Sequence, residues 1–202
     1  MKFVIATQNP GKVVEIRDIL RREDLELVSL AELGITDDPV EDGETFEANA
    51  LIKARAACIA TGLPAFADDS GLEVKALGGR PGIHSARYGG FKGDFPKKMA
   101  MLLQEPELLA SPDRSACFTA AVACVFPDGR EFTVRGECPG ILAYEPRGNG
   151  GFGYDPLFLL PDLNKTFAEI PEEEKNSRSH RAAALKEFSK RLDEYLPLEK
   201  GK

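Results

Sequence analysis

The sequence predicts an α/β fold with a mixed β-sheet, and two observations support this prediction. Between residues 3 and 60, short apolar runs alternate with segments whose apolar residues recur every three or four positions, which is typical of strand–helix alternation. Later, residues 116–126 and 131–135 are two β-rich runs joined by the turn sequence "PDG", which predicts a hairpin. We therefore expect a single α/β domain over residues 1–202, with two lobes and an active-site cleft between them.

The first predicted strand leads into a helix through a short polar turn. Phe3–Ala6 is the apolar strand, "TQNPGK" at residues 7–12 is the turn, and apolar residues spaced from Val13 to Leu20 predict the helix. At such a turn, backbone N–H groups and the positive end of the helix can bind phosphate, and Lys12 adds a positive charge. The turn lacks the Gly and the Ser or Thr that a Walker A loop requires, and an ordinary strand–turn–helix connection fits it equally well.

The alternation of strands and helices continues beyond this turn. Leu25–Ser29 predicts a second strand, and "DDPVEDGET" at residues 37–45 is an acidic loop. Thr45 is a typical N-cap for a helix over Phe46–Ala60, and Gly62 is a typical residue to end it.

Two adjacent aspartates follow the next strand. The segment "AFADDSGL" predicts a strand over residues 65–67 that ends at Asp68 and Asp69. Neighbouring carboxylates repel each other, and each is costly to remove from water unless a positive charge lies against it. In strand geometry they point to opposite faces, so we expect one to face a metal ion or an attacking water and the other to face a cation such as Lys12. A solvated turn is the alternative, since Asp, Ser and Gly are ordinary turn residues.

The rest of the chain supplies the second half of the fold. The elements predicted before the hairpin are a half-buried strand at Leu72 and Val74, a glycine-rich loop at 77–90, and a helix through Gln104 that Asp94 can cap. The hairpin is followed by a loop at 148–161 that leads into a strand. The final helix begins after Ser179, and its buried face is predicted to contain Leu185, Phe188, Leu192 and Tyr195.

Composition restricts the class of protein. Of the 202 residues, 43% are hydrophobic and 29% are charged, which is typical of a globular protein. A net charge of −7 argues against a nucleic-acid-binding protein, but it permits a small phosphate ligand at a local group of cations. The longest nearly apolar run, Ala116–Phe126, is too short to span a bilayer, and the polar residues that follow Phe3–Ala6 argue against a signal peptide. We therefore expect a cytoplasmic protein that binds neither nucleic acid nor membranes.

The residues that can bind metal point to magnesium rather than zinc. The four cysteines lack CxxC spacing and the chain has two histidines, so we expect core thiols, and nothing local supports a Cys–His nucleophile pair. Magnesium needs only one or two carboxylates, together with water and substrate phosphate oxygens. Glu41, Asp42, Asp68 and Asp69 are the candidates. For the first two, a solvated loop is the alternative.

The segment "KNSRSHRAAALKEF" at residues 175–188 places cations at the start of the last helix. Arg178, His180 and Arg181 lie around its first turn, where a positive charge opposes the helix dipole by about 0.3–1 kcal/mol. They are either solvated, with a serine as the helix cap, or they face an anionic or carbonyl-bearing ligand. His180 and Arg181 would suit the ring nitrogen and oxo edge of a purine.

The segment "GFGYDP" at residues 151–156 combines glycines with two aromatic residues. The glycines allow a close approach of the backbone, and Phe152 could stack on a base. A position of Phe152 and Tyr154 in the core, at the start of a strand, is an equally good interpretation.

Taken together, these segments resemble the inosine/xanthosine triphosphate pyrophosphatase family, which removes non-standard purine nucleotides. The segments that carry the resemblance occur in the family's order and span nearly the whole chain: "TQNPGK", "TFEANALIKA", "FADDSGLEVKALGGRPGIHSARY", "GGFGYDPLF" and "SHRAAAL". The chain departs from the family pattern at Gln8, where a small residue is common, and at Ala48, where Glu is common.

The resemblance implies a fold, a reaction and a set of site residues. The fold is two-lobed, with a long central mixed β-sheet flanked by helices, and it forms a homodimer. The reaction is Mg²⁺-dependent hydrolysis of ITP, dITP or XTP by water to the monophosphate and pyrophosphate. Glu41 and Asp69 would be metal ligands, and Asp69 would also be the base for the water. The implied substrate contacts are Thr7, Gln8, Asn9, Pro10, Gly11 and Lys12 for the phosphates, with Ser70, Phe152, Gly153, Tyr154, Asp155, Lys175, His180 and Arg181 elsewhere.

These roles are consistent with the chemistry of the reaction. Catalysis would depend on Asp69, Lys12 and Asp68, and Lys12 and Lys175 could stabilise the charge that develops on the leaving pyrophosphate. A 6-oxo group accepts a hydrogen bond from His180 or Arg181, whereas the amino group of adenine would leave these donors unpaired, which can discriminate by roughly 10⁴–10⁵-fold. Two alternatives stay open: a pyrophosphatase for standard or pyrimidine triphosphates, and a nucleotide-sensing module without turnover.

Overall fold

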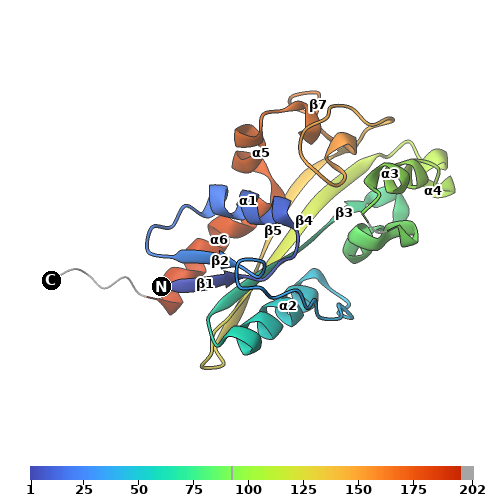
Figure 1. Ribbon diagram of the computed structural model, residues 1–202. Coiled ribbons are helices and arrows are strands. Elements are labelled where there is room, and N and C mark those ends of the chain that lie inside the picture. Colours follow the sequence, from blue (N-terminus) through green and yellow to red (C-terminus); the bar gives the residue numbers. More distant parts are fainter. Residues whose placement is uncertain (92, 197–202) are drawn as a thin grey trace. The chain divides into compact units, whose positions relative to one another are not determined.

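The structure is a computed structural model that describes residues 1–91 and 93–196, and Figure 1 shows its elements. The strands are β1 (Lys2–Ile5), β2 (Glu26–Ser29), β3 (Ala65–Val74), β4 (Ser115–Val125), β5 (Glu131–Leu142), β6 (Phe158–Leu160) and β7 (Lys165–Thr166). The α-helices are α1 (Pro10–Leu20), α2 (Phe46–Thr61), α3 (Phe95–Leu103), α4 (Pro106–Ala110), α5 (Glu172–Arg178) and α6 (His180–Tyr195). The 3-10 helices are η1 (Lys75–Leu77), η2 (Gly82–Gly90), η3 (Asp155–Leu157) and η4 (Phe167–Glu169).

The strands form one mixed sheet in the order β2-β1-β3-β4-β5-β6-β7. β1 pairs in parallel with both β2 and β3, whereas β6 pairs antiparallel with β5 and β7. β4 and β5 are joined by the turn at residues 126–130, in which the N–H of Gly129 donates to the carbonyl of Phe126 at 3.0 Å. The predicted α/β class, the mixed sheet and the hairpin are therefore confirmed.

The chain divides into two compact units. Unit 1 consists of Met1–Asp69, Ala120–Gly136 and the chain from Arg181 onward, and unit 2 consists of Ser70–Thr119 and Glu137–His180. Each of β3, β4 and β5 contributes residues to both units. Among the described residues, no helix is long and apolar enough to cross a membrane.

Unit 1 packs helices on both faces of its strands. Alternate residues of β1 belong to different clusters: Phe3 and Ile5 pack with residues of α1 and α6, whereas Val4 packs with residues of α2. The same alternation holds in β3, where Phe66 contacts Phe188 of α6 with ring centroids 4.9 Å apart. Figure 1 shows α1 and α6 on one side of β1 and β2, and α2 on the other side. This alternation is the pattern expected of strands that are buried on both faces.

Capping hydrogen bonds mark the start of three helices, and those at Thr45 and Asp94 confirm predicted starts, whereas α1 begins at Pro10, before the expected Val13. The Asn9 side chain accepts from the N–H groups of Gly11 and Lys12 at the start of α1. Thr45 Oγ1 accepts from Ala48 N at the start of α2, and Asp94 Oδ1 accepts from a backbone N–H of α3. Each cap satisfies an N–H group that has no partner within its own helix.

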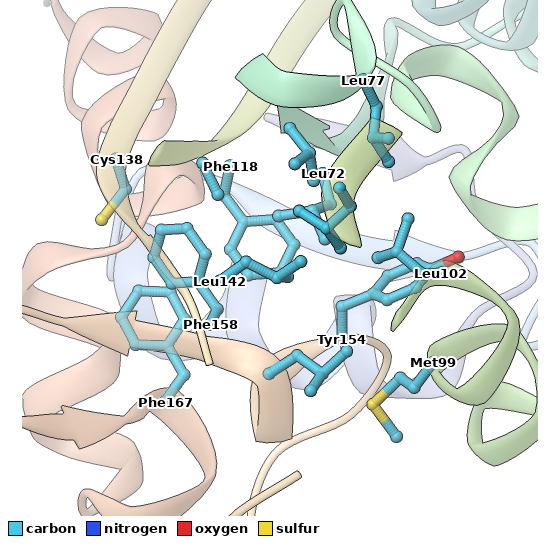
Figure 2. Packing of buried hydrophobic residues seen from close by; sticks show 14 of the residues in the cluster. Leu72, Leu77, Met99, Leu102, Phe118, Cys138, Leu142, Tyr154, Phe158 and Phe167 are labelled. Carbon is cyan, nitrogen blue, oxygen red and sulfur yellow. The ribbon is translucent and has the colours of Figure 1, made fainter. Parts of the chain in front are cut away.

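Unit 2 has a separate core that is rich in aromatic rings. Leu72 and Val74 of β3, helix α3 and strands β4–β6 contribute to it. Phe118 lies 4.5 Å from Phe158 and 5.9 Å from Phe167, measured between ring centroids, and Figure 2 shows these rings beside Leu142.

Several sequence expectations differ from the structure, and one is the end of β5, which lies at Leu142 rather than at Arg135. β3 does not end at Asp68 and Asp69 but runs without interruption to Val74, because buried cations compensate both carboxylates, as described below. The glycine-rich segment 77–90 is not an irregular loop throughout, because η2 occupies Gly82–Gly90.

Candidate active site

The turn between β1 and α1 presents its backbone and one lysine. The N–H groups of Gly11 and Lys12 donate to Asn9 Oδ1 at 2.9 and 3.3 Å, and the N–H of Asn9 donates to Thr7 Oγ1 at 3.2 Å. Gln8 Nε2 donates to the carbonyl of Ile35 at 3.1 Å, which ties the turn to the segment after β2. The turn is therefore an ordered loop at a helix N-terminus, the geometry that favours anions.

Asp68 lies within a buried group of charges. Its side chain receives Lys12 Nζ at 2.5 Å and Arg181 Nε at 2.9 Å, and Arg181 also donates to Glu15. Asp68 and Arg181 are each 1% exposed. Burial favours protonation of Asp68, but Arg181 and Lys12 outweigh it and lower its pKa below the usual range. Asp68 is therefore ionised and holds Lys12 and Arg181, so of the two aspartates it is the one that faces the expected cation.

Asp69 faces a different cation. Lys53 Nζ contacts Asp69 Oδ1 at 2.7 Å and Glu41 Oε1 at 3.4 Å, so the two predicted metal ligands converge on one ammonium group. Burial raises the pKa of Asp69, and Lys53 opposes this shift. Burial also works to lower the pKa of Lys53, but Asp69 and Glu41 outweigh it and raise the pKa. The two aspartates thus have different partners, as their opposite faces predict.

The surroundings of Asp69 fit a magnesium ion. Asp69 Oδ2 is buried and has no hydrogen-bond partner in the part of the chain that the structure describes, although a buried carboxylate oxygen is normally satisfied. Within the described residues, no group of three or more His, Cys, Asp or Glu side chains is arranged to hold a metal. Two carboxylates are nevertheless sufficient for Mg²⁺ that also binds water and substrate phosphates. Three cations and four carboxylates meet in this part of unit 1, which leaves a net charge of −1 when all are ionised.

The segment 151–155 of unit 2 is held around a second buried ion pair. Lys175 Nζ contacts Asp155 Oδ2 at 2.6 Å, and the N–H of Phe152 donates to the same oxygen at 2.8 Å. Lys175 Nζ also lies 4.5 Å from the centroid of the Phe152 ring. Gly151 has a φ of +67°, and a Cβ there would collide with the Asp155 carboxylate. The structure therefore brings Phe152, Asp155 and Lys175 together, and their role as substrate contacts stays a prediction.

Tyr154 and His180 are buried in unit 2. Tyr154 is 2% exposed, belongs to the core shown in Figure 2, and donates its hydroxyl to the carbonyl of Ser85 at 3.1 Å. Any contact of Tyr154 with a ligand would therefore involve its backbone. His180 stacks on Phe118, with ring centroids 4.8 Å apart and planes inclined by 16°. Ser70, on β3, is half-buried.

The sequence analysis missed two buried members of the charged group. Lys53 is buried on the alanine-rich face of α2, close to Ala50 and Ala54. Because a lysine is rarely buried without an ion pair, its position among alanines indicates that it faces a carboxylate. Glu15 is buried on α1 and pairs with Arg181, although helical spacing alone would have left it at the surface. Arg181 is enclosed by Glu15 and Asp68 in unit 1, so its expected contact with a purine stays a prediction.

This chain is similar to known proteins in both sequence and fold. The model of the Ham1 family matches residues 3–191. The chain belongs to the Ham1 family. Its relatives include the dITP/XTP pyrophosphatase of Bacillus subtilis, 46% identical over 94% of this chain and 96% of the relative. A dITP/XTP pyrophosphatase of Thermus thermophilus is 48% identical over 92% of this chain and 89% of the relative.

Solved structures of Ham1 proteins support the same family fold. A HAM1 protein from Coxiella burnetii has a TM-score of 0.87 and 39% identity, and the match covers 96% of this chain and 99% of that one. The Ham1 protein of Staphylococcus aureus has a TM-score of 0.85 and 37% identity, with 96% and 100% covered. The predicted family and the predicted α/β fold are therefore confirmed over nearly the whole length of the chain.

Proposed function

We propose that this chain hydrolyses non-standard purine nucleoside triphosphates (ITP, dITP and XTP) to the monophosphate and pyrophosphate, with water as the nucleophile. Relatives that are 46–48% identical over more than nine-tenths of the chain carry the name dITP/XTP pyrophosphatase. The observation that carries the proposal is the buried pair Asp68 and Asp69, in which one carboxylate is saturated by cations and the other keeps an unpaired oxygen.

Asp69 is proposed as the group that accepts a proton from the attacking water. Lys53 fixes one of its oxygens, Oδ1, at 2.7 Å, which leaves Oδ2 to face the water. Burial raises the pKa of Asp69 and so makes it a better proton acceptor than an exposed aspartate. Asp68 does not have this freedom, because Arg181 and Lys12 hold it ionised.

The first helix and its lysine are proposed to bind the phosphates. Thr7–Lys12 form an ordered loop at the N-terminus of α1, where anions are favoured. Lys12 Nζ lies at Asp68 and can share its charge with a phosphate oxygen without leaving that carboxylate, because an ammonium group has three donors. Its position would stabilise charge that develops on the leaving pyrophosphate.

Magnesium is the proposed cofactor, held by Glu41 and Asp69. When bound, Mg²⁺ would neutralise triphosphate charge and lower the pKa of water. The net negative charge of the surrounding side chains favours a divalent cation. Lys53, between the two carboxylates, holds them close together before the ion arrives.

The purine is proposed to bind the aromatic and polar side chains of unit 2. Phe152 is half-buried beside Lys175 and has a ring face suited to stacking on a base. His180, whose ring is held by Phe118, is the proposed hydrogen-bond partner of the 6-oxo group, and Arg181 is its neighbour in sequence. Ser70, Gly153 and the backbone of Tyr154 complete the proposed contacts.

A nucleotide panel tests this function. ITP, dITP, XTP, ATP, GTP, dTTP and UTP are each incubated with the protein and Mg²⁺ or with a chelator, and pyrophosphate and orthophosphate are measured separately. We expect pyrophosphate release from ITP, dITP and XTP only, and none with the chelator. Equal turnover of ATP or dTTP would overturn the substrate assignment, and orthophosphate as the first product would overturn the reaction.

A variant separates hydrolysis from simple nucleotide binding. Asp69→Asn should retain the fold and lose most turnover, because the neutral amide neither accepts the proton nor contributes charge to the ion. Thermal stabilisation by ITP and Mg²⁺ without any pyrophosphate release, in the unmodified protein, would instead indicate a nucleotide-sensing module. We further propose a cytoplasmic homodimer that binds neither nucleic acid nor membranes, consistent with the net charge of −7.

A further inference from the structure

Asn49 of α2 is a fully buried residue that the mechanism above does not use. It is 0% exposed, and its Oδ1 accepts a hydrogen bond from the N–H of Gly43 at 2.9 Å. This contact fixes the orientation of the side-chain amide, because an N–H group requires the oxygen rather than the nitrogen opposite it. The Nδ2 group is therefore identified as the donor, and it is buried without a hydrogen-bond partner among the described residues.

The loop before α2 lies directly on this side chain. A Cβ added to Gly43 would lie 2.7 Å from Asn49 Oδ1 and 2.8 Å from the Cβ of Ala48, closer than such atoms approach in proteins. Only a glycine allows the loop to come so near the helix. The hydrogen bond and the close contact together hold the loop against α2. Glu41 lies two residues before Gly43, so its position depends on how this loop is held.

Asn49 and Lys53 share one face of α2. They are four residues apart, so their side chains leave the same side of the helix one turn from each other. Lys53 contacts both Glu41 and Asp69, whose Oδ2 is also buried without a partner. The same region thus contains one unfilled donor, on Asn49, and one unfilled acceptor, on Asp69. A hydrated cation can satisfy both, because its charge satisfies the carboxylate and a water of its outer hydration shell, whose oxygen does not coordinate the ion, accepts from the amide.

We propose that Asn49 is a positioning residue for the divalent cation. Its Oδ1 holds the loop of residues 41–44 so that Glu41 would reach the ion, and its Nδ2 would donate a hydrogen bond to a water molecule of the ion's outer hydration shell. This inference rests on the proposed Mg²⁺ site at Glu41 and Asp69. Groups that support metal ligands in this way typically change metal affinity by roughly 10–100-fold when they are removed.

Manganese binding tests the inference without relying on activity. Mn²⁺ has similar oxygen ligands to Mg²⁺, and its binding can be followed by electron paramagnetic resonance, with the protein alone and with inosine monophosphate. We expect Asn49→Ala to weaken Mn²⁺ binding by about 10–100-fold. Gly43→Ala, which displaces the loop but keeps Asn49, should weaken binding in the same direction. Thr61→Val is the matched control, because it removes a side-chain hydrogen bond to Ala57 at the far end of α2 and should leave Mn²⁺ affinity unchanged.

A second measurement separates positioning from a purely structural role. In ITP hydrolysis, the Mg²⁺ concentration for half-maximal rate should rise in Asn49→Ala, whereas the rate at saturating Mg²⁺ should recover most of its value. Unchanged Mn²⁺ affinity in both variants, with stability lowered, would overturn the inference and leave the proposed function standing. Absence of Mn²⁺ binding in the unmodified protein would overturn the metal site itself, and the nucleotide panel would then show whether hydrolysis survives without it.

Discussion

The two units bury charged side chains in different ways. In unit 1, Arg181 lies between two carboxylates and Asp68 lies between two cations, so that buried charges alternate from Glu15 to Lys12. In unit 2, Lys175 and Asp155 form a buried pair that is reinforced by a backbone N–H and by the face of the Phe152 ring. The first arrangement is a network of ionised side chains, and the second is one ion pair supported by neutral groups.

This difference suggests a different role in ligand binding for each unit: adjustable charge in unit 1 and a fixed shape in unit 2. A network of ion pairs can rearrange its charge when a polyphosphate and a cation arrive, because each member already has more than one partner. A pair held by the backbone fixes the shape of one segment, here residues 151–155, and shape decides which base fits. We therefore expect damage in unit 1 to affect both stability and catalysis, and damage in unit 2 to affect mainly substrate binding.

Removal of Arg181 should have the largest effect on stability. Arg181→Met leaves Asp68 and Glu15 buried with one cation fewer, and the loss of a buried partner typically costs about 3–5 kcal/mol. We expect the upper end of this range, because two carboxylates lose the same partner. Urea unfolding of the variant and the unmodified protein measures the difference.

The double variant Glu15→Gln/Arg181→Met provides the control. It removes one of the two carboxylates that Arg181 compensates, so it should recover part of the lost free energy of unfolding. Strict additivity of the two substitutions would contradict the network and would indicate that Glu15 and Arg181 contribute independently.

Removal of Lys175 should have a smaller effect on stability and a distinct effect on kinetics. Lys175→Met removes the cation from Asp155, but the N–H of Phe152 still donates to that carboxylate, so we expect a loss of about 3 kcal/mol. Because segment 151–155 loosens, KM for ITP should rise by more than kcat falls. A fall in kcat with unchanged KM would contradict a role of this segment in substrate binding.

Local sequence patterns predict several strands and helices of both units, but not the short helices α4 and α5. The caps Thr45 and Asp94 are side chains within a few residues of the N–H groups they satisfy, so their role can be predicted from the sequence, whereas the cap Asn9 was not predicted. The "PDG" hairpin has the same local character. Two strands run beyond their expected ends and show the limit of such patterns: β3 continues past Asp68 and Asp69 to Val74, and β5 continues past Arg135 to Leu142.

The charged group of unit 1 could be predicted only in part, because its contacts are distant in sequence. Asp68 and Lys12 stand out as chemistry-bearing residues, and their contact across 56 positions was expected from the need for a counter-charge. Glu15 contacts Arg181 across 166 positions, and nothing in its own helix distinguishes it from an exposed glutamate. Tertiary folding decides such partners, whereas the aromatic segment of unit 2 is organised by contacts closer in sequence, across three positions from Phe152 to Asp155 and 20 positions from Asp155 to Lys175.

Gly151 offers a sharper test of the segment in unit 2. Gly151→Ala places a Cβ against the Asp155 carboxylate at a positive φ of +67°, so it combines backbone strain with displacement of the Lys175–Asp155 pair. We expect a loss of about 2–3 kcal/mol in urea unfolding, together with weaker ITP binding. Gly90→Ala is the control, because Gly90 has a φ of +76° but no atom of the described residues lies within 4 Å of its added Cβ, and it should show the backbone strain of about 1 kcal/mol alone. Equal losses in the two variants would show that Asp155 moves aside without cost.

Replacement of Lys98 should have the smallest effect on the free energy of unfolding, and it should raise this free energy rather than lower it. This lysine of α3 is 0% exposed, donates to the carbonyl of Ala86 at 2.6 Å, and lies 4.0 Å from the centroid of the Phe95 ring. Burial lowers the pKa of its ammonium group, and Asp94 opposes the shift only in part. The folded state therefore disfavours the charged form, unlike in unit 1, where carboxylates compensate every buried cation described above.

The pH dependence of stability follows from this lowered pKa. Between the lowered value and about 10.5, the unfolded chain binds more protons at Lys98 than the folded chain, so this group makes stability rise with pH in that window. Lys98→Met removes the charge and keeps most of the side-chain volume, so we expect a gain of roughly 1 kcal/mol at neutral pH, reduced by the loss of the Ala86 hydrogen bond. Urea unfolding of both proteins from pH 7 to 10 should show the gain shrinking as pH rises. A gain that is constant with pH would assign it to packing, and a loss at neutral pH would show that the aromatic face of Phe95 compensates a buried cation as well as a carboxylate does.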